Sequence, residues 1–221
     1  MRFRNRSEAG RVLATKLAAY SNRANVVVLA LPRGGVPVAY EVAEALQAPL
    51  DVFLVRKLGV PGHEELAMGA IATGGIRQLN EDIVRYFDIS AATINAVAAK
   101  EQKELERRER LYRNGRVPMS LKDQIVILVD DGLATGSSMR AAAAAVREQK
   151  PARIVVAVPV AATSTCEELR GEVDETVCAE TPEPFRAVGL WYEDFSQTSD
   201  EEVRDLLERT EYAHSPTGSR R

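Results

Sequence analysis

The sequence has few cysteines and no long hydrophobic run. Its two cysteines, Cys166 and Cys178, form no CxxC pair and no Cys/His ligand set, so neither a disulfide framework nor a zinc site is indicated. We expect both to be small, buried, apolar residues. No apolar stretch approaches the ~20 residues that span a bilayer, and the N-terminal MRFRNRSEAG lacks the apolar segment of a signal peptide. These absences favour a protein of the reducing cytoplasm that has no membrane contact.

An excess of positive charge is also lacking. The net charge is −3 at pH 7, so nucleic acid is not an expected partner, because such proteins present surfaces rich in Lys and Arg. Hydrophobic residues make up 45% and charged residues 28% of the 221 residues, which is typical of a soluble domain with a real core. The length allows one large domain or two small ones.

Helical periodicities and short apolar runs alternate along the chain. The predicted strands are residues 26–31, 51–56, 124–129, 153–159 and 173–178, with a hairpin in 66–79 that turns at Gly74 and Gly75. The predicted helices are residues 7–20, with Ser7 as N-cap, 38–47, 91–113, 137–149 and 201–209. Such alternation is typical of parallel sheets built from strand–helix–strand units. We therefore predict one α/β domain over residues 1–214, with a mostly parallel central sheet flanked by helices, and a disordered tail over 215–221.

The predicted helix at 91–113 is long and highly charged. Its pattern fits a solvated face, and the alternative is an element that closes over a site or joins two subunits. The charges alone do not decide between these interpretations.

The stretch VILVDDGLATGSS, residues 126–138, combines a buried strand with polar residues that carry chemistry. Ligands of open α/β sheets bind at the carboxyl ends of the strands, where Asp130 and Asp131 fall. The residues that follow, Ala134, Thr135, Gly136, Ser137 and Ser138, lead directly into a helix, whose free N–H groups and dipole attract a phosphate. Two carboxylates would repel that phosphate but would accept hydrogen bonds from the hydroxyl groups of a sugar. The stretch therefore predicts a site for a ribose 5-phosphate.

Two other nucleotide-binding motifs are excluded by single residues. A P-loop needs Lys after its last glycine, where this chain has Ser137, and no GxGxxG follows any predicted strand.

The stretch resembles the phosphoribosyl diphosphate (PRPP) binding motif of the type I phosphoribosyltransferases, which has four hydrophobic residues, two acids and a loop ending in TG followed by Ser or Thr. LPRGGVPV, residues 31–38, resembles that family's diphosphate loop, and VRKLGVPGHEELAMGAI, residues 55–71, resembles the start of its flap. The resemblance covers residues 25–160. It implies a flap at about 58–80 and a hood or cap at about 180–212.

The resemblance implies a transfer of ribose 5-phosphate from PRPP to a nitrogen acceptor such as a nucleobase, with loss of diphosphate and with Mg²⁺ as cofactor. Asp130 and Asp131 would hold the ribose hydroxyls and, largely through PRPP and water, the Mg²⁺. The loop at 134–138 would bind the 5′-phosphate. The diphosphate would lie on Arg33, Gly34 and Gly35, and Lys57 would reach it from the other side, unless that lysine is merely solvated.

Two further groups of candidates belong to the flap and the hood. His63, Glu64 and Glu65 lie in a Gly/Pro-bounded loop that could close over the site, with His63 either an acid–base group or simply exposed. The aromatic-rich stretch at 182–195 suggests a base pocket formed by Phe185, Val188, Trp191 and Tyr192, with Phe195 nearby. The alternative is that these aromatic side chains only close the core.

Two positions depart from the better-known purine enzymes of the family. Ala134 stands where hypoxanthine-type enzymes carry Asp, and Ala67-Met68 stand where adenine-type enzymes carry Glu-Tyr. The acceptor is therefore not assigned. A PRPP- or nucleotide-sensing regulator on the same fold is the alternative function, and a homodimer is compatible with either.

Overall fold

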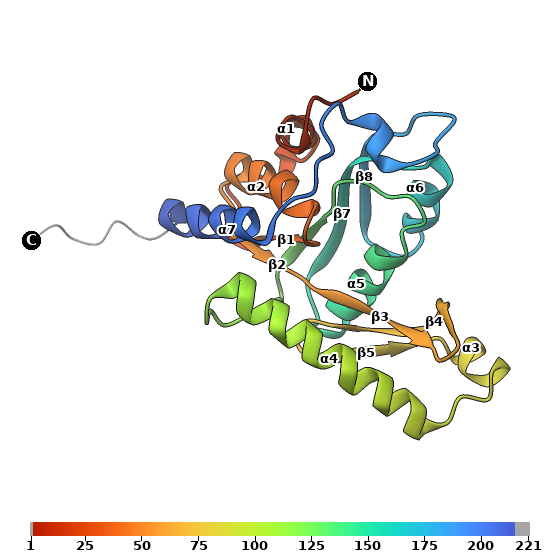
Figure 1. The fold of residues 1–221 in the computed structure, drawn as a ribbon. Coiled ribbons are helices and arrows are strands. Elements are labelled where there is room, and N and C mark those ends of the chain that lie inside the picture. Colours follow the sequence, from red (N-terminus) through yellow and green to blue (C-terminus); the bar gives the residue numbers. More distant parts are fainter. Residues whose placement is uncertain (1, 215–221) are drawn as a thin grey trace, which may run out of the picture.

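A computed structural model describes residues 2–214, with side chains as far as Thr210. The tail predicted at 215–221 lies outside the described residues. Figure 1 shows a central sheet covered by helices on both faces, with a smaller sheet beside it.

The central sheet has five parallel strands in the order β2-β1-β6-β7-β8. Their bounds are β1 Val26–Ala30, β2 Leu50–Val52, β6 Ile125–Val129, β7 Arg153–Val160 and β8 Glu175–Glu180. Every residue of β1 and β6 is buried, because both faces of the sheet are covered. The predicted α/β fold with a mostly parallel central sheet is thereby confirmed.

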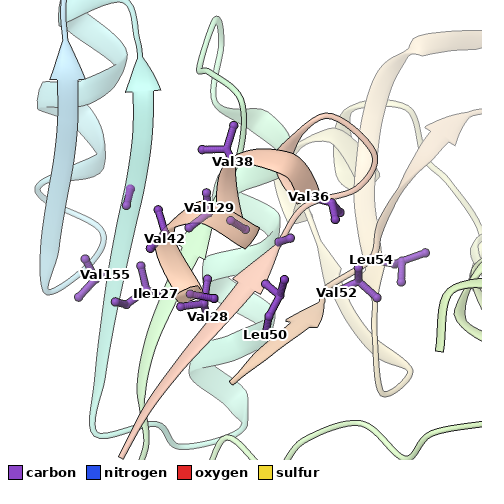
Figure 2. Close-up of a cluster of buried hydrophobic side chains, with 14 of the residues drawn as sticks. Val28, Val36, Val38, Val42, Leu50, Val52, Leu54, Ile127, Val129 and Val155 are labelled. Atoms are coloured by element: carbon purple, nitrogen blue, oxygen red, sulfur yellow. The ribbon is translucent and has the colours of Figure 1, made fainter. Parts of the chain in front are cut away.

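The helices divide the hydrophobic residues into two layers, one on each face of the sheet. Val28, Ile127 and Val129 face helix α2 (Gly35–Leu46), as Figure 2 shows, and α1 (Arg6–Lys16) packs on the same side. Leu29 and Leu128 face the opposite layer, which contains α5 (Ser137–Glu148) and α6 (Thr163–Leu169). This alternation follows from the two-residue period of a strand.

The smaller sheet is antiparallel and contains β3 (Val55–Val60), β4 (His63–Ala72) and β5 (Ile76–Leu79). The predicted hairpin at Gly74 and Gly75 is confirmed, since both residues have positive φ between β4 and β5. The single strand predicted at 51–56 is wrong. The chain leaves the parallel sheet after β2, and Leu54 donates its amide to Thr73 Oγ1 instead, so two short strands of different sheets replace one.

Two predictions about the helices need correction, and two short helices were missed. The N-cap of α1 is Asn5, whose side chain accepts from the Glu8 amide, and not Ser7. Helix α2 begins at Gly35 and not at residue 38, because Pro37 falls in the first turn, where a missing N–H breaks no helical hydrogen bond. The helices α3 (Glu81–Tyr86) and α6 were not predicted, since both are too short to show a clear period.

The predicted helices at 91–113 and 201–209 are present as α4 (Ala91–Arg113) and α7 (Asp200–His214). Helix α4 lies along β3 and β4 and also contacts α7 (Figure 1). A buried stripe that includes Ile94, Ala98 and Leu105 attaches it to the smaller sheet. The helix is therefore solvated on one side only.

The prediction of two unlinked cysteines is wrong. Cys166 of α6 and Cys178 of β8 form a disulfide. Helix α6 packs against β8, and this contact brings the two side chains together. The sequence spacing of twelve residues gave no sign of that contact. Across residues 2–214, no helix combines the length and the apolar character needed to cross a bilayer.

Candidate active site at the carboxyl edge of the sheet

Asp130 and Asp131 follow the last residue of β6, at the carboxyl edge of the parallel sheet. Oδ1 of Asp130 accepts a hydrogen bond of 2.8 Å from the Asp131 amide. Burial raises the pKa of the Asp130 carboxyl well above its ordinary value, and the neighbouring Asp131 raises it further. Burial also raises the pKa of Asp131, although Arg6 opposes this shift. Because the two carboxyls are buried side by side, a cation or hydrogen-bond donor bound between them would stabilise their charged forms.

The glycine loop of the predicted diphosphate site touches this acid pair. A Cβ atom at Gly34 would overlap Oδ2 of Asp131, and one at Gly35 would lie 2.8 Å from the carbonyl oxygen of Val129. Only glycine permits so close an approach. The structure thus brings residues 34–35 and the two acids together, although almost a hundred residues separate them in the sequence.

Arg6 is a residue of this site that sequence reasoning missed. Its Nε and Nη2 each lie 2.8 Å from Oδ2 of Asp131, and its Nη1 donates to the Ser196 carbonyl at 2.7 Å. The guanidinium also lies 4.0 Å from the centre of the Phe195 ring. No local pattern could have revealed this pair, because Arg6 and Asp131 are 125 positions apart.

The loop at 134–138 has the geometry of an anion site. Gly136 has φ of 71° and forms the N-cap of α5, and Thr135 Oγ1 lies 3.1 Å from Ser137 Oγ. Two carbonyl oxygens of this loop are already engaged: Thr165 Oγ1 donates to Ala134, and Arg140 donates to Thr135. Across residues 2–214, no protein acceptor engages the amides of residues 135–138. These N–H groups are available to a phosphate.

Arg56 and Lys57 point to opposite faces of β3, because successive side chains of a strand alternate between its two faces. Arg56 lines a pocket of about 100 Å³ that also contains Asp130 and Ser138. Lys57 lines a second pocket, of about 430 Å³, between the smaller sheet and α5, together with Ser137 and Ser138. Lys57 therefore faces the phosphate loop rather than Asp130, and its Nζ donates to the Glu65 carbonyl at 3.3 Å. Arg33 lies near α7, with Nη1 3.7 Å from Oδ1 of Asp200.

The flap candidates lie at the tip of the β3–β4 hairpin. His63, Glu64 and Glu65 are exposed. The His63 ring lies 5.3 Å from the Phe87 ring, and Glu64 accepts from the Gly62 amide. The contacts of these three residues thus lie within the flap and its neighbouring helix, and the structure does not bring them to the acid pair.

The four hood candidates lie in one apolar cluster, and one of them also bonds to the acid pair. Tyr192 is fully buried and its hydroxyl donates to the Asp131 carbonyl at 2.6 Å. Burial raises the Tyr192 pKa well above its ordinary value, so the phenol stays protonated. A Cβ atom at Gly132 would lie 2.5 Å from Val188 Cγ1. Phe185, Val188, Trp191 and Tyr192 all pack with Phe3 in one small apolar cluster, which favours the core-closing interpretation.

A parallel sheet with paired acids, a glycine loop and unbonded amides of a helix N-terminus at one edge is typical of α/β proteins that bind phosphate-bearing ligands there. Residues 4–191 match the model of the phosphoribosyl transferase domain, and the chain belongs to that family.

Similar proteins agree with this assignment. A protein found in two strains of Mycobacterium tuberculosis, whose name assigns it provisionally to the phosphoribosyl transferases, is 48% identical over 217 residues. The match covers 98% of this chain and 49% of that protein, so the chain spans about half the length of these curated relatives.

Two solved structures share the fold. The protein TT1426 from Thermus thermophilus has a TM-score of 0.85 and 44% identity, over 95% of this chain and 99% of its own. The AQ2163 protein from Aquifex aeolicus has a TM-score of 0.50 and 16% identity, over 95% of this chain and 86% of its own.

Proposed function

We propose that the protein transfers ribose 5-phosphate from PRPP to a nitrogen acceptor, a nucleobase or a similar base, and releases diphosphate. One observation carries this proposal. The acid pair after β6 touches the glycine loop at the start of α2, and the loop that begins with these acids leads to the free amides at the start of α5. PRPP has a group for each of these parts. Its ribose hydroxyls suit the acid pair, its diphosphate suits the glycine loop, and its 5′-phosphate suits the amides of α5.

The acid pair suits two neighbouring hydroxyl groups. Oδ1 of Asp130 accepts a hydrogen bond from the Asp131 amide, and Oδ2 of Asp131 accepts one from Arg6. Across residues 2–214, no other residue donates a hydrogen bond to the second oxygen of either carboxylate. Each acid can therefore accept one hydroxyl, and charged acceptors make stronger hydrogen bonds than neutral ones.

The same carboxylates fit a Mg²⁺ ion that is held mainly by its substrate. The part of the chain that the structure describes has no cluster of three or more His, Cys, Asp or Glu side chains suited to a metal. Mg²⁺ usually takes few protein ligands and keeps water and phosphate oxygens. Asp130 and Asp131 would hold it beside PRPP, where it would neutralise the charge of the departing diphosphate. Burial of both carboxyls favours such a cation.

The acceptor would lie on the hood side of the acid pair. Phe195 is 37% exposed and is the aromatic ring against which Arg6 stacks, whereas Tyr192 is buried. An exposed ring beside the ribose site could support a planar base. Nucleotide salvage and homodimer formation remain predictions that accompany this proposal. The prediction of a reducing, cytoplasmic location loses the support of its cysteine argument, because Cys166 and Cys178 form a disulfide.

The test is to incubate the protein with PRPP, Mg²⁺ and a panel of nucleobases and to measure the release of diphosphate. Release that depends on one base supports the transferase. Tight PRPP binding without release favours the sensing regulator instead.

We also expect the double variant Asp130→Asn/Asp131→Asn to lose PRPP binding, because the ribose hydroxyls lose both charged acceptors. The measurement is calorimetric titration with PRPP. A double variant that folds and binds PRPP as tightly as the wild type would contradict the assigned role.

A further inference from the structure

The charged helix α4 contributes a cation to the pocket beside Asp130. That pocket, of about 100 Å³, is lined by Pro32 before the glycine loop, by Ser138 of the phosphate loop, by Arg56 of β3 and by Arg108 of α4. It thus lies between the two loops that would hold the ends of PRPP. Two arginines and Asp130 are therefore among the residues that line it.

Both guanidinium groups are held by carboxylates of α4 itself. Arg56 lies 2.6 Å from Oε2 of Glu101, and Arg108 lies 2.8 Å from Oε1 of Glu104. The two arginine side chains are 31% and 34% exposed, so neither is locked in the core. Ion pairs of this exposure are weak and can exchange for a better anion.

Glu104 has a second partner that makes such an exchange inexpensive. Arg107 donates from Nε to Oε2 and from Nη2 to Oε1 of the same carboxylate. Hydrogen bonds from Arg107 and Arg108 lower the Glu104 pKa to about 2, so its charge persists at any working pH. If Arg108 turns away, Arg107 still neutralises Glu104.

We propose that Arg108 of α4, supported by Arg56, binds the diphosphate of PRPP by leaving Glu104 for the phosphate oxygens. Arg33, the cation predicted for this task from the sequence, makes a longer and similarly exposed ion pair with Asp200 of α7, so it stays a candidate for the same diphosphate. The long charged helix then has a specific role as one wall of the donor site. This inference rests on the proposed function.

Arg107 provides a matched control for Arg108. Both lie on α4 and bind Glu104, but Arg107 is 57% exposed and does not line the pocket. The experiment is calorimetric titration of the wild type, Arg108→Gln and Arg107→Gln with PRPP and Mg²⁺, and separately with ribose 5-phosphate, which lacks the diphosphate. Circular dichroism melting checks that both variants fold.

We expect Arg108→Gln to raise the Kd for PRPP roughly tenfold, as the loss of one charge-assisted contact would. Arg107→Gln should raise this Kd less, because Arg108 still reaches the diphosphate although Glu104 then has no second partner. Neither variant should change the Kd for ribose 5-phosphate. Equal effects of the two substitutions on PRPP binding, or an equal loss of ribose 5-phosphate binding in Arg108→Gln, would overturn the inference but leave the proposed function intact. Absence of PRPP binding in the wild type would overturn both.

Discussion

Arg6 connects the first helix of the protein to the acid pair and to the hood. Its side chain is 11% exposed and that of Asp131 is 14% exposed, so the pair is nearly buried. Removal of one partner leaves the other charge without compensation. We expect Arg6→Met to lower the free energy of unfolding by about 3 kcal/mol in urea titrations.

Arg4 supplies the control for this prediction. It pairs with Glu8 on the surface, with 69% of its side chain exposed, so Arg4→Met should cost less than about 0.5 kcal/mol. Adding Asp131→Asn to Arg6→Met should recover part of the loss, because no charge then remains unpaired. Equal destabilisation by Arg6→Met and Arg4→Met would show that the buried pair adds no more to the free energy of unfolding than a surface pair does.

At the scale of residues, the sequence revealed those that lie close together along the chain. The acids, the loop at 134–138 and the glycines at 34–35 each sit in a continuous motif, and the structure gathers them at one edge of the sheet. Arg6 could not be predicted, because its partner is distant in the sequence. The opposite placement of Arg56 and Lys57 could not be predicted either, since it depends on where the chain leaves the parallel sheet.

At the scale of elements, α6 links the disulfide to the phosphate loop. Cys166 is bonded to Cys178 of β8, while the adjacent Thr165 donates to the Ala134 carbonyl at 2.6 Å. The bond closes a loop of twelve positions, which in the chain-entropy model contributes about 3 kcal/mol to stability. We therefore expect dithiothreitol to lower the free energy of unfolding by about that amount.

The double variant Cys166→Ser/Cys178→Ser is the control, and its unfolding curve should not respond to dithiothreitol. A thiol assay on the denatured, unreduced wild type should detect no free thiols. Two reactive thiols in that assay would refute the disulfide.

Apolar runs that form one strand each were reliable guides to the sheet, and a run shared between two strands was not. VVVLA and IVILV are buried on both faces and became β1 and β6, as predicted. DVFLVR contains the end of β2 and the start of β3. Its apolar residues suit either sheet, so nothing in the sequence marks the break at residues 53–54. The pairing of strands decides such boundaries, and it depends on the whole fold.

At the scale of the whole molecule, the proposed site joins parts that are distant in sequence: the start of α1, the loop before α2, the end of β6 and the wall formed by α4. A ligand that binds all of them stabilises the folded state over the unfolded chain. PRPP with Mg²⁺ at a hundred times its Kd should add about 2.7 kcal/mol. For a domain of this size, that corresponds to a rise in Tm of roughly 5–10 °C.

This rise should depend on the metal. The acid pair and the diphosphate are both negative, so without Mg²⁺ they repel each other, and PRPP with EDTA should give little of the shift. The measurement is thermal unfolding with PRPP and Mg²⁺, with PRPP and EDTA, and with Mg²⁺ alone. The Asp130→Asn/Asp131→Asn variant should show no shift under any of the three conditions. A full shift in the presence of EDTA would contradict a role for Mg²⁺ in holding PRPP, because the two carboxylates would then tolerate the diphosphate unaided.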